Sequence, residues 1–393
     1  MFGFTMQTCP KLSGQLVLIC LVAMSPQILA ADRDADPLTP KDQLVSSEEI
    51  ESRLEPLLSK HKVPGIVAGI VENGEFTVAG GVGLRKIGSP EAMTVHDKLH
   101  LGSNTKAMTA TLIALLVERK LLSWNSTIGE IFPDLDPAPH PDFRKVTVLQ
   151  LLTHRGELPA NGPWWKLGKG SLIDQRETLL RKILVQPPQH PPDSKLLYSN
   201  AGYVIAGHMA EKVTGKSWEN LMSEHLFTPL KMTSAGFGIP STKNQVDQPW
   251  GHQVTLGIQT TLQIDNDPAL GPAGTVYCTI QDWSRFIGMH LEGAQGTSQF
   301  LTPESFKVLH TAVSGDPFAC GWIIAERPWA KGTVLTHTGS NTTWYSMVWI
   351  APKLNAAFMS VTNHGDESGR KACDDAIVEL IGLQAKSKKE RSE

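Results

Sequence analysis

A serine followed three residues later by a lysine, at the start of a long apolar segment, is the feature that most constrains this chain. Ser103 and Lys106 open a segment that predicts a helix running to about Arg119. Residues three apart on a helix lie on one face, so the Lys106 amine can reach the Ser103 hydroxyl. A serine hydroxyl is a poor nucleophile at neutral pH until a neighbouring base takes its proton. The pair therefore predicts a serine nucleophile and its activator at the beginning of a helix.

Two later segments supply the other groups that acyl transfer by a serine requires, a proton source and an oxyanion hole. They are Tyr198-Ser199-Asn200 and His337-Thr338-Gly339-Ser340. Lys106 can act as the base if burial or adjacent positive charge lowers its pKa. Tyr198 is a second candidate, because a phenolate beside lysine and histidine cations could take the Ser103 proton and pass it on. The sequence does not rank these two bases, and we treat them as a coupled pair.

Backbone N–H groups are expected to form the oxyanion hole. One is that of Ser103, because N–H groups at a helix start are unpaired and the helix dipole favours negative charge there. The other is expected from the strand that follows Gly339, since glycine lets a substrate approach the backbone closely.

Each of these residues also has a purely structural interpretation. Ser103 suits a helix cap, Lys106 a surface lysine and Tyr198 a core aromatic residue. Their joint occurrence in this order favours the catalytic interpretation. His154 and His208 lack such support and are predicted to be structural. The sequence contains no His-Glu-x-x-His motif or paired His/Asp cluster, so neither a metal nor another cofactor is expected.

Strand patterns occur at both ends of the chain, and helical patterns fill the middle. The expected strands are residues 63–71, 76–80, 320–324, 333–336, 346–350 and 356–361. Helices are expected after Ser46 and over 372–383. This order predicts an α/β (α+β) fold, an antiparallel sheet flanked by helices with an inserted helical subdomain and a site at their junction. We place one hydrolase domain at 47–385, with sheet parts at about 47–120 and 271–385 and the helical part at about 121–270.

The first 31 residues resemble a secretory signal peptide, since Lys11 precedes the apolar run 16–24 and small residues follow at Ala30 and Ala31. The run is too short for a typical membrane span, so no stable span is expected after cleavage. A periplasmic or secreted location is predicted. A membrane tether through an uncleaved N-terminal segment is the alternative, and lipidation at Cys20 is another. Residues 32–46 are predicted to be a linker and 386–393 a polar tail.

The net charge of −3 gives no reason to expect nucleic-acid binding, and a small molecule or peptide is the expected substrate. Cys278, Cys320 and Cys373 remain after signal cleavage. Their odd number and wide spacing do not suit a disulfide framework or a zinc site. We predict three small buried apolar residues, with one bridge plus a free thiol as the alternative.

Taken together, these motifs resemble those of the serine β-lactamase-related hydrolases of the class C type. That family includes class C β-lactamases, D,D-carboxypeptidases, D-aminopeptidases and family VIII esterases. The resemblance covers about residues 48–383. It extends to the segments Val63-Pro64-Gly65, Leu151-Leu152-Thr153-His154, Gly271-Pro272-Ala273-Gly274, Asp282-Trp283-Ser284-Arg285-Phe286 and Thr362-Asn363.

The resemblance implies a catalytic role for three residues. Ser103 corresponds to the acylated nucleophile, Lys106 to its activator and Tyr198 to the general base and acid. The fold it implies is an antiparallel sheet flanked by helices, with a helical subdomain.

The resemblance also implies a substrate-binding group of Asn200, His337, Gly339 and Ser340. Asn200 is expected to contact a substrate amide, and the Ser340 backbone to join the oxyanion hole. The third motif usually begins with lysine, and His337 stands in its place. Histidine is mostly neutral at pH 7, so its grip on a substrate carboxylate is weaker than that of lysine. Efficient β-lactam hydrolysis is therefore not expected.

A second departure from the family lies after His154, where Arg155-Gly156-Glu157 replaces the usual Thr-Ser-Gly. We predict that this segment is a salt-bridged loop.

These observations predict a serine hydrolase that cleaves an ester or amide bond through an acyl-enzyme on Ser103. D-amino-acid peptides and β-lactams are among the candidate substrates. The alternatives are a true class C-like β-lactamase and a non-catalytic penicillin-binding or sensor protein of the same fold.

Overall fold

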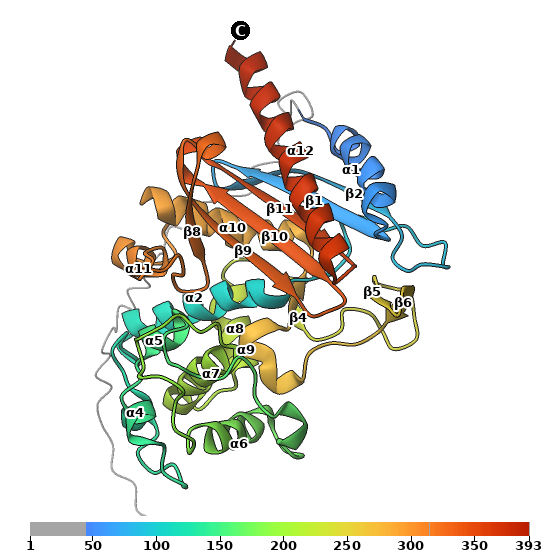
Figure 1. Ribbon diagram of the computed structural model, residues 1–393. Coiled ribbons are helices and arrows are strands. Elements are labelled where there is room, and N and C mark those ends of the chain that lie inside the picture. The colour runs from blue at the N-terminus through green and yellow to red at the C-terminus, as the bar shows by residue number, and fades with distance from the viewer. Residues whose placement is uncertain (1–44, 314, 393) are drawn as a thin grey trace, which may run out of the picture. The chain divides into compact units, whose positions relative to one another are not determined.

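A six-stranded antiparallel sheet built from both ends of the chain forms the centre of the fold (Figure 1). The computed structural model describes residues 45–313 and 315–392, so the predicted signal peptide and most of the predicted linker lie outside the described residues. The strand order is β2-β1-β11-β10-β9-β8. The strands are β1 (Gly65–Glu72), β2 (Glu75–Gly83), β8 (Ile323–Arg327), β9 (Gly332–Ser340), β10 (Tyr345–Ala351) and β11 (Ala356–Thr362).

The first two strands form the hairpin that the sequence predicts. Asn73 and Gly74 both adopt positive φ, 55° and 80°, as a two-residue type I′ turn requires. Every residue of β11 and all but the last of β1 are buried. Such continuous apolar strands are typical of a sheet that is covered on both faces.

Helices cover the two faces of this sheet. Helices α1 (Ser47–His61) and α12 (Glu367–Ser392) pack on one face, and α10 (Ile280–Gln295) packs on the other (Figure 1). Successive strand side chains alternate between the two sides, so Ile66 belongs to the core beneath α1 and α12 while Val67 belongs to the opposite core.

The middle of the chain is helical and is inserted between the first and last strands of the sheet. The predicted fold class, an antiparallel sheet flanked by helices with an inserted helical part, is therefore confirmed. Its helices are α2 (Thr105–Glu118), α3 (Ile128–Ile131), α4 (Pro141–Arg144), α5 (Val148–Leu152), α6 (Leu172–Ile183), α7 (Asn200–Thr214), α8 (Trp218–Met222), α9 (Gly271–Gly274) and α11 (Pro303–Leu309). The remaining strands are β3 (Leu99–His100), β4 (Gly236–Phe237), β5 (Gly251–Thr255), β6 (Ile258–Leu262) and β7 (Val276–Cys278). The exact subdomain boundaries stay a prediction.

Two predicted elements differ from the structure. The strand expected at 320–324 begins only at Ile323, because the chain turns at Gly321 with φ +78° against α2. A Cβ at Gly321 would lie 2.5 Å from the Ala107 Cα, so the close approach requires glycine. The last helix, Glu367–Ser392, is longer at both ends than the predicted 372–383. In its polar end, Lys388 donates a hydrogen bond to the Leu354 carbonyl.

The cap at Ser46 and the state of the cysteines match their predictions. Ser46 Oγ accepts a hydrogen bond from the Glu49 N–H. Cys278, Cys320 and Cys373 are all free and buried.

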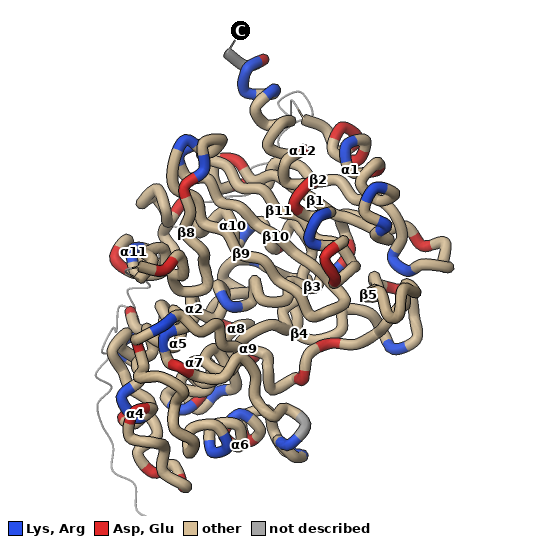
Figure 2. The backbone as a smooth tube through the Cα atoms, in the orientation of Figure 1, with Lys and Arg blue, Asp and Glu red and all other residues tan. Residues whose placement is uncertain are grey.

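Basic and acidic residues are interspersed over the elements (Figure 2). Across residues 45–313 and 315–392, none of the helices combines the length and apolar character that a membrane crossing needs.

Candidate active site

The segment that carries Ser103 is clamped to the central sheet. Ser103 lies in a short 3₁₀ turn, Gly102–Asn104, immediately before α2. Asn104 Nδ2 donates to Ser346 Oγ at 2.7 Å, and Ser346 Oγ donates to the Leu101 carbonyl at 2.8 Å. Because Ser346 belongs to β10, an inner strand of the sheet, these two bonds fix the Ser103 segment against the sheet.

Lys106 is the second residue of α2, about one turn after Ser103, and its side chain faces Ser103, as the spacing predicts. Its Nζ lies 3.1 Å from Ser103 Oγ, 2.7 Å from Asn200 Oδ1 and 2.7 Å from the Ala273 carbonyl oxygen. The side chain is fully buried, and desolvation lowers its pKa well below the ordinary lysine value.

The partners of Lys106 decide what its neutral amine can do. Asn200 Oδ1 and the Ala273 carbonyl can only accept hydrogen bonds, so they take the two protons of a neutral amine. The remaining lone pair then faces the Ser103 hydroxyl, as a general base requires.

The phenol of Tyr198 also lies beside Ser103. Lys106 Nζ lies 4.9 Å from the centre of the Tyr198 ring. Burial raises the pKa of Tyr198 to about 12, and the interaction with the Ser103 side chain acts to lower it by less. These shifts oppose the phenolate that the sequence analysis considered, and they favour a neutral phenol that can donate a proton.

Asn200 begins α7, and its amide is engaged at both ends. Oδ1 accepts from Lys106, and Nδ2 donates to Asn161 Oδ1 at 2.8 Å. Ser199 caps the same helix by accepting from the Gly202 N–H. Asn200 therefore orients Lys106, and a substrate amide would have to share or replace its bond to Asn161.

His337 is neutral and almost fully buried in β9. Desolvation is the main cause that lowers its pKa to about 3, and Lys106 adds to it in its protonated form. Neither ring nitrogen has a hydrogen-bond partner among the described residues, and the side chain is 3% exposed. The histidine cation that the phenolate hypothesis invoked is therefore not present near pH 7.

Two glycines bring the end of β9 against the nucleophile segment. Gly102 has φ +49°, and a Cβ there would lie 2.4 Å from the Ser340 nitrogen. A Cβ at Gly339 would lie 2.0 Å from the Leu101 carbonyl oxygen and 2.8 Å from the Ser103 nitrogen. The backbones of Ser103 and Ser340 thus lie side by side, as a two-donor oxyanion hole needs.

A buried polar chain supports both sides of this contact. His100 Nδ1 accepts from the Gly102 N–H at 3.1 Å, and His100 Nε2 lies 2.8 Å from Asp265 Oδ1. Asp265 Oδ1 also accepts from Asn341 Nδ2 at 2.9 Å. Asn341 follows Ser340, so the chain links the residues that flank both backbone donors.

Sequence reasoning missed several residues of the site. The Ala273 carbonyl lies in a recognised segment, but a backbone acceptor has no residue signature. Asn161 carried no motif. His154, predicted to be structural, lies against Tyr198 with ring centres 4.3 Å apart. Phe318 packs edge-on against both rings, with its centre 6.2 Å from that of Tyr198 and 5.4 Å from that of His154.

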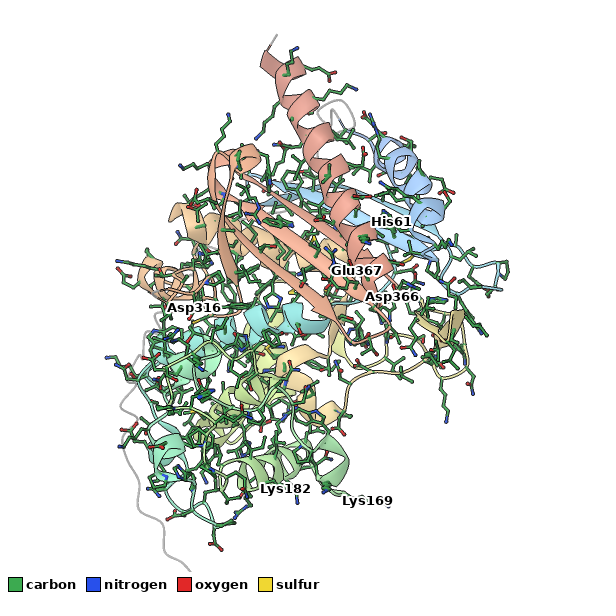
Figure 3. All side chains as sticks on the ribbon, viewed as in Figure 1. His61, Lys169, Lys182, Asp316, Asp366 and Glu367 are labelled. Atoms are coloured by element: carbon green, nitrogen blue, oxygen red, sulfur yellow. The ribbon has the colours of Figure 1, made fainter. Side chains whose placement is uncertain are left out.

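The loop after His154 is salt-bridged, as predicted. Arg155 Nε lies 2.6 Å from Asp193 Oδ1, and Arg155 Nη1 pairs with Asp316. Asp316 lies where the helical region meets the sheet region (Figure 3). Arg155 therefore joins the segment that carries Phe318 to the helical region.

His208 lies in a separate part of the helical region. Its ring stacks on Phe132 with centres 5.2 Å apart, and Nδ1 lies 2.7 Å from Glu211 Oε2. Glu211 in turn pairs with the buried Arg176. Phe132, His208 and Glu211 line part of a cavity of about 320 Å³ to which none of the motif residues contributes.

Replacing Gly339 by alanine is expected to lower the acylation rate by ~10²–10³, the cost of losing one oxyanion donor. The added Cβ would overlap the Leu101 carbonyl oxygen and push β9 away from the Ser103 nitrogen. The measurement is the rate of Ser103 labelling by a fluorophosphonate.

Gly382→Ala is the matched control for this substitution. Gly382 lies in α12 with open space around its Cα, so alanine there should raise helix stability by up to ~1 kcal/mol and leave labelling unchanged. Full labelling of Gly339→Ala would contradict the close approach.

Comparisons with known proteins bear on the whole domain. The sequence model of the Beta-lactamase family matches residues 50–381. Penicillin-binding protein 4 of Amycolatopsis lactamdurans is 26% identical over 355 residues, 84% of this chain and 88% of that protein. An unguisins hydrolase of Aspergillus violaceofuscus (strain CBS 115571) is 26% identical over 211 residues, 52% of this chain but only 35% of that protein.

Solved structures show the same fold. The octameric penicillin-binding protein homologue from Pyrococcus abyssi superposes with a TM-score of 0.72 at 21% identity. The match covers 86% of this chain and 78% of that one.

Proposed function

Because the chain belongs to the Beta-lactamase family, we propose that it is a serine hydrolase that cleaves an ester or amide bond through an acyl-enzyme on Ser103. One observation carries the proposal most directly. The buried Lys106 amine lies 3.1 Å from Ser103 Oγ, and its other two hydrogen-bonding directions are taken by acceptors.

Lys106 takes the Ser103 proton as Oγ attacks the carbonyl carbon of the substrate. The N–H groups of Ser103 and Ser340 stabilise the oxyanion of the tetrahedral intermediate. Collapse of that intermediate breaks the bond to the leaving group, which receives a proton from the Tyr198 hydroxyl. Tyr198 regains its proton from Lys106, and water then hydrolyses the acyl-enzyme by the reverse proton path.

The charge of the site favours uncharged esters and amides. The group at the head of the third motif, His337, is a neutral imidazole, so it offers no cation to a substrate carboxylate. Penicillins and D-alanyl-D-alanine peptides carry such a carboxylate. They remain the second candidate class because a relative that aligns over 84% of this chain is named a penicillin-binding protein.

The test is intact-mass spectrometry of the protein after incubation with a fluorophosphonate, a p-nitrophenyl ester, a D-alanyl-D-alanine peptide and a penicillin. A mass gain or turnover that disappears in Ser103→Ala is expected. Ser52→Ala, on the exposed side of α1, should behave as the native protein. If Ser103→Ala retains full labelling and turnover, the mechanism is wrong. The absence of any adduct would favour the non-catalytic alternative.

The same measurement addresses the location of the protein. We infer export to the periplasm or the medium from the signal-peptide pattern of residues 1–31. The mass of the protein recovered from the periplasmic fraction should lack about those residues. A full-length mass in the membrane fraction would favour the uncleaved tether.

A further inference from the structure

His154 holds the chain on both sides of Tyr198. The Leu197 N–H donates to the His154 carbonyl oxygen at 2.9 Å, and the Ser199 N–H donates to His154 Nδ1 at 3.1 Å. Between these two bonds, the Tyr198 ring lies against the imidazole with centres 4.3 Å apart and planes tilted by 31°. One residue thus contacts the backbone before and after Tyr198 and the face of its ring.

The conformation of His154 is costly, which indicates that the surrounding structure requires it. Its φ is +60°, a value that non-glycine residues seldom adopt. The side chain is only 2% exposed, and Nε2 has no hydrogen-bond partner among the described residues. Backbone strain and an unpaired buried donor persist where neighbouring contacts hold them, and they concentrate at active sites.

The bond to Ser199 determines the tautomer of the ring. Nδ1 accepts a hydrogen bond, so in the neutral imidazole the proton is on Nε2. Burial is the main cause that holds the pKa of His154 well below its ordinary value, so the Nδ1 lone pair remains available.

We propose that His154 is a positioning residue that holds Tyr198 where its hydroxyl can protonate the leaving group. This inference rests on the proposed function, in which Tyr198 donates that proton. His154 acts on the reaction through the backbone of Leu197 and Ser199 and touches none of the reacting atoms.

Two substitutions separate the hydrogen bond from the rest of the side chain. Asparagine and glycine both tolerate positive φ, and both remove the imidazole ring. They differ because the Asn Oδ1 occupies the position of His Nδ1 and can accept from the Ser199 N–H, whereas glycine offers no acceptor. His154→Asn should therefore rescue much of what His154→Gly loses.

The readout is the dependence of acylation on the leaving group. Ethyl butyrate and p-nitrophenyl butyrate form the same acyl-enzyme, but only the ethyl ester needs a proton donor to release its alcohol. His154→Gly is expected to lower kcat/KM for the ethyl ester at least about tenfold more than for the p-nitrophenyl ester, as partial loss of acid catalysis predicts. His154→Asn should keep the ratio of the two rates within about threefold of the native value.

A double-substitution cycle with Tyr198→Phe tests whether the effect passes through Tyr198. Without the hydroxyl, His154→Gly should no longer change the ratio of the two esters. His208→Gly, at another buried and stacked histidine, is the control and should leave the ratio unchanged in folded protein. Equal losses on both esters, or an unchanged effect in the Tyr198→Phe background, would show that His154 only supports packing.

Crystal structures of the two variants separate this proposal from the proposed function. The Tyr198 hydroxyl should leave hydrogen-bonding distance of Ser103 in His154→Gly and stay within it in His154→Asn. An unmoved Tyr198 in His154→Gly would overturn the positioning role, even for a protein that hydrolyses neither ester. Failure of the native protein to be labelled at Ser103 would refute the proposed function alone.

Discussion

Replacing Lys106 by methionine is expected to lower the rate of Ser103 acylation by ~10²–10⁴, the usual contribution of a general base. Methionine has a similar length and suits the fully buried position, but it has no lone pair that can take the Ser103 proton. Asn200 Oδ1 and the Ala273 carbonyl would each lose a donor. Removing the desolvated amine offsets part of that loss, so the variant should remain folded.

The measurement is the second-order rate of fluorophosphonate labelling as a function of pH. In the native protein the lowered pKa of Lys106 places more of its amine in the neutral form near pH 7 than an ordinary lysine would have. Lys106→Met should be labelled more slowly, and its labelling rate should no longer show the change with pH that comes from the titration of Lys106.

Lys216→Met is the matched control, because Lys216 is an exposed lysine whose Nζ lies 2.5 Å from Glu224. Its labelling rate should equal that of the native protein. A Lys106→Met variant that is labelled at the native rate would remove Lys106 as the base and return that role to Tyr198.

The proximity of the candidate catalytic residues could be predicted because it rests on short contiguous motifs. Ser103 and Lys106 meet at 3.1 Å because they are three residues apart at a helix start. Tyr198 and Asn200 flank the start of α7, so one helix terminus brings both toward Lys106. The order of strands and helices likewise predicted a sheet made from both ends of the chain.

What the sequence could not show are contacts between distant segments and the charge states that burial imposes. The bond from Lys106 to the Ala273 carbonyl joins two backbone segments that share no pattern. The series of polar contacts from His100 through Asp265 to Asn341 joins three segments that lie far apart in the sequence.

The histidine in the third motif illustrates the second difficulty. A residue letter does not tell a charged imidazole from a neutral one. His337 is neutral because β9 buries it beside Lys106, which only the folded structure reveals. The same applies to His154, whose proposed positioning role rests on two hydrogen bonds to the backbone that its residue type does not reveal.

Lowering the pH from 7.5 to 5 is expected to destabilise the protein by roughly 6 kcal/mol. Burial lowers the pKa of His252 to about 4, and of His310 and His337 to about 3. In the unfolded chain a histidine has a pKa of about 6.5, so at pH 5 each of these three would gain a proton on unfolding. One pH unit corresponds to about 1.36 kcal/mol, so keeping each of these histidines neutral lowers the free energy of unfolding by about 2 kcal/mol at pH 5.

The direction of the effect follows from which state binds more protons. The folded state holds these rings neutral, so their contribution is fully present above about pH 6.5 and is lost as the pH falls toward the folded pKa values of about 3 to 4. His154 and His290 are shifted in the same direction. A loss of this size is comparable with the total stability of a typical domain, about 5–15 kcal/mol, so unfolding should begin near pH 5.

Urea unfolding of the protein at pH 7.5 and pH 5 measures this loss. Replacing His310 by glutamine should reduce the difference between the two pH values by about 2 kcal/mol, because glutamine does not titrate. The exposed His96 is the control, and His96→Gln should leave the difference unchanged. Equal stability of the native protein at pH 7.5 and pH 5 would show that the buried histidines are already protonated in the folded state at pH 5. It would also contradict the lowered pKa of His337, on which the preference for uncharged substrates depends.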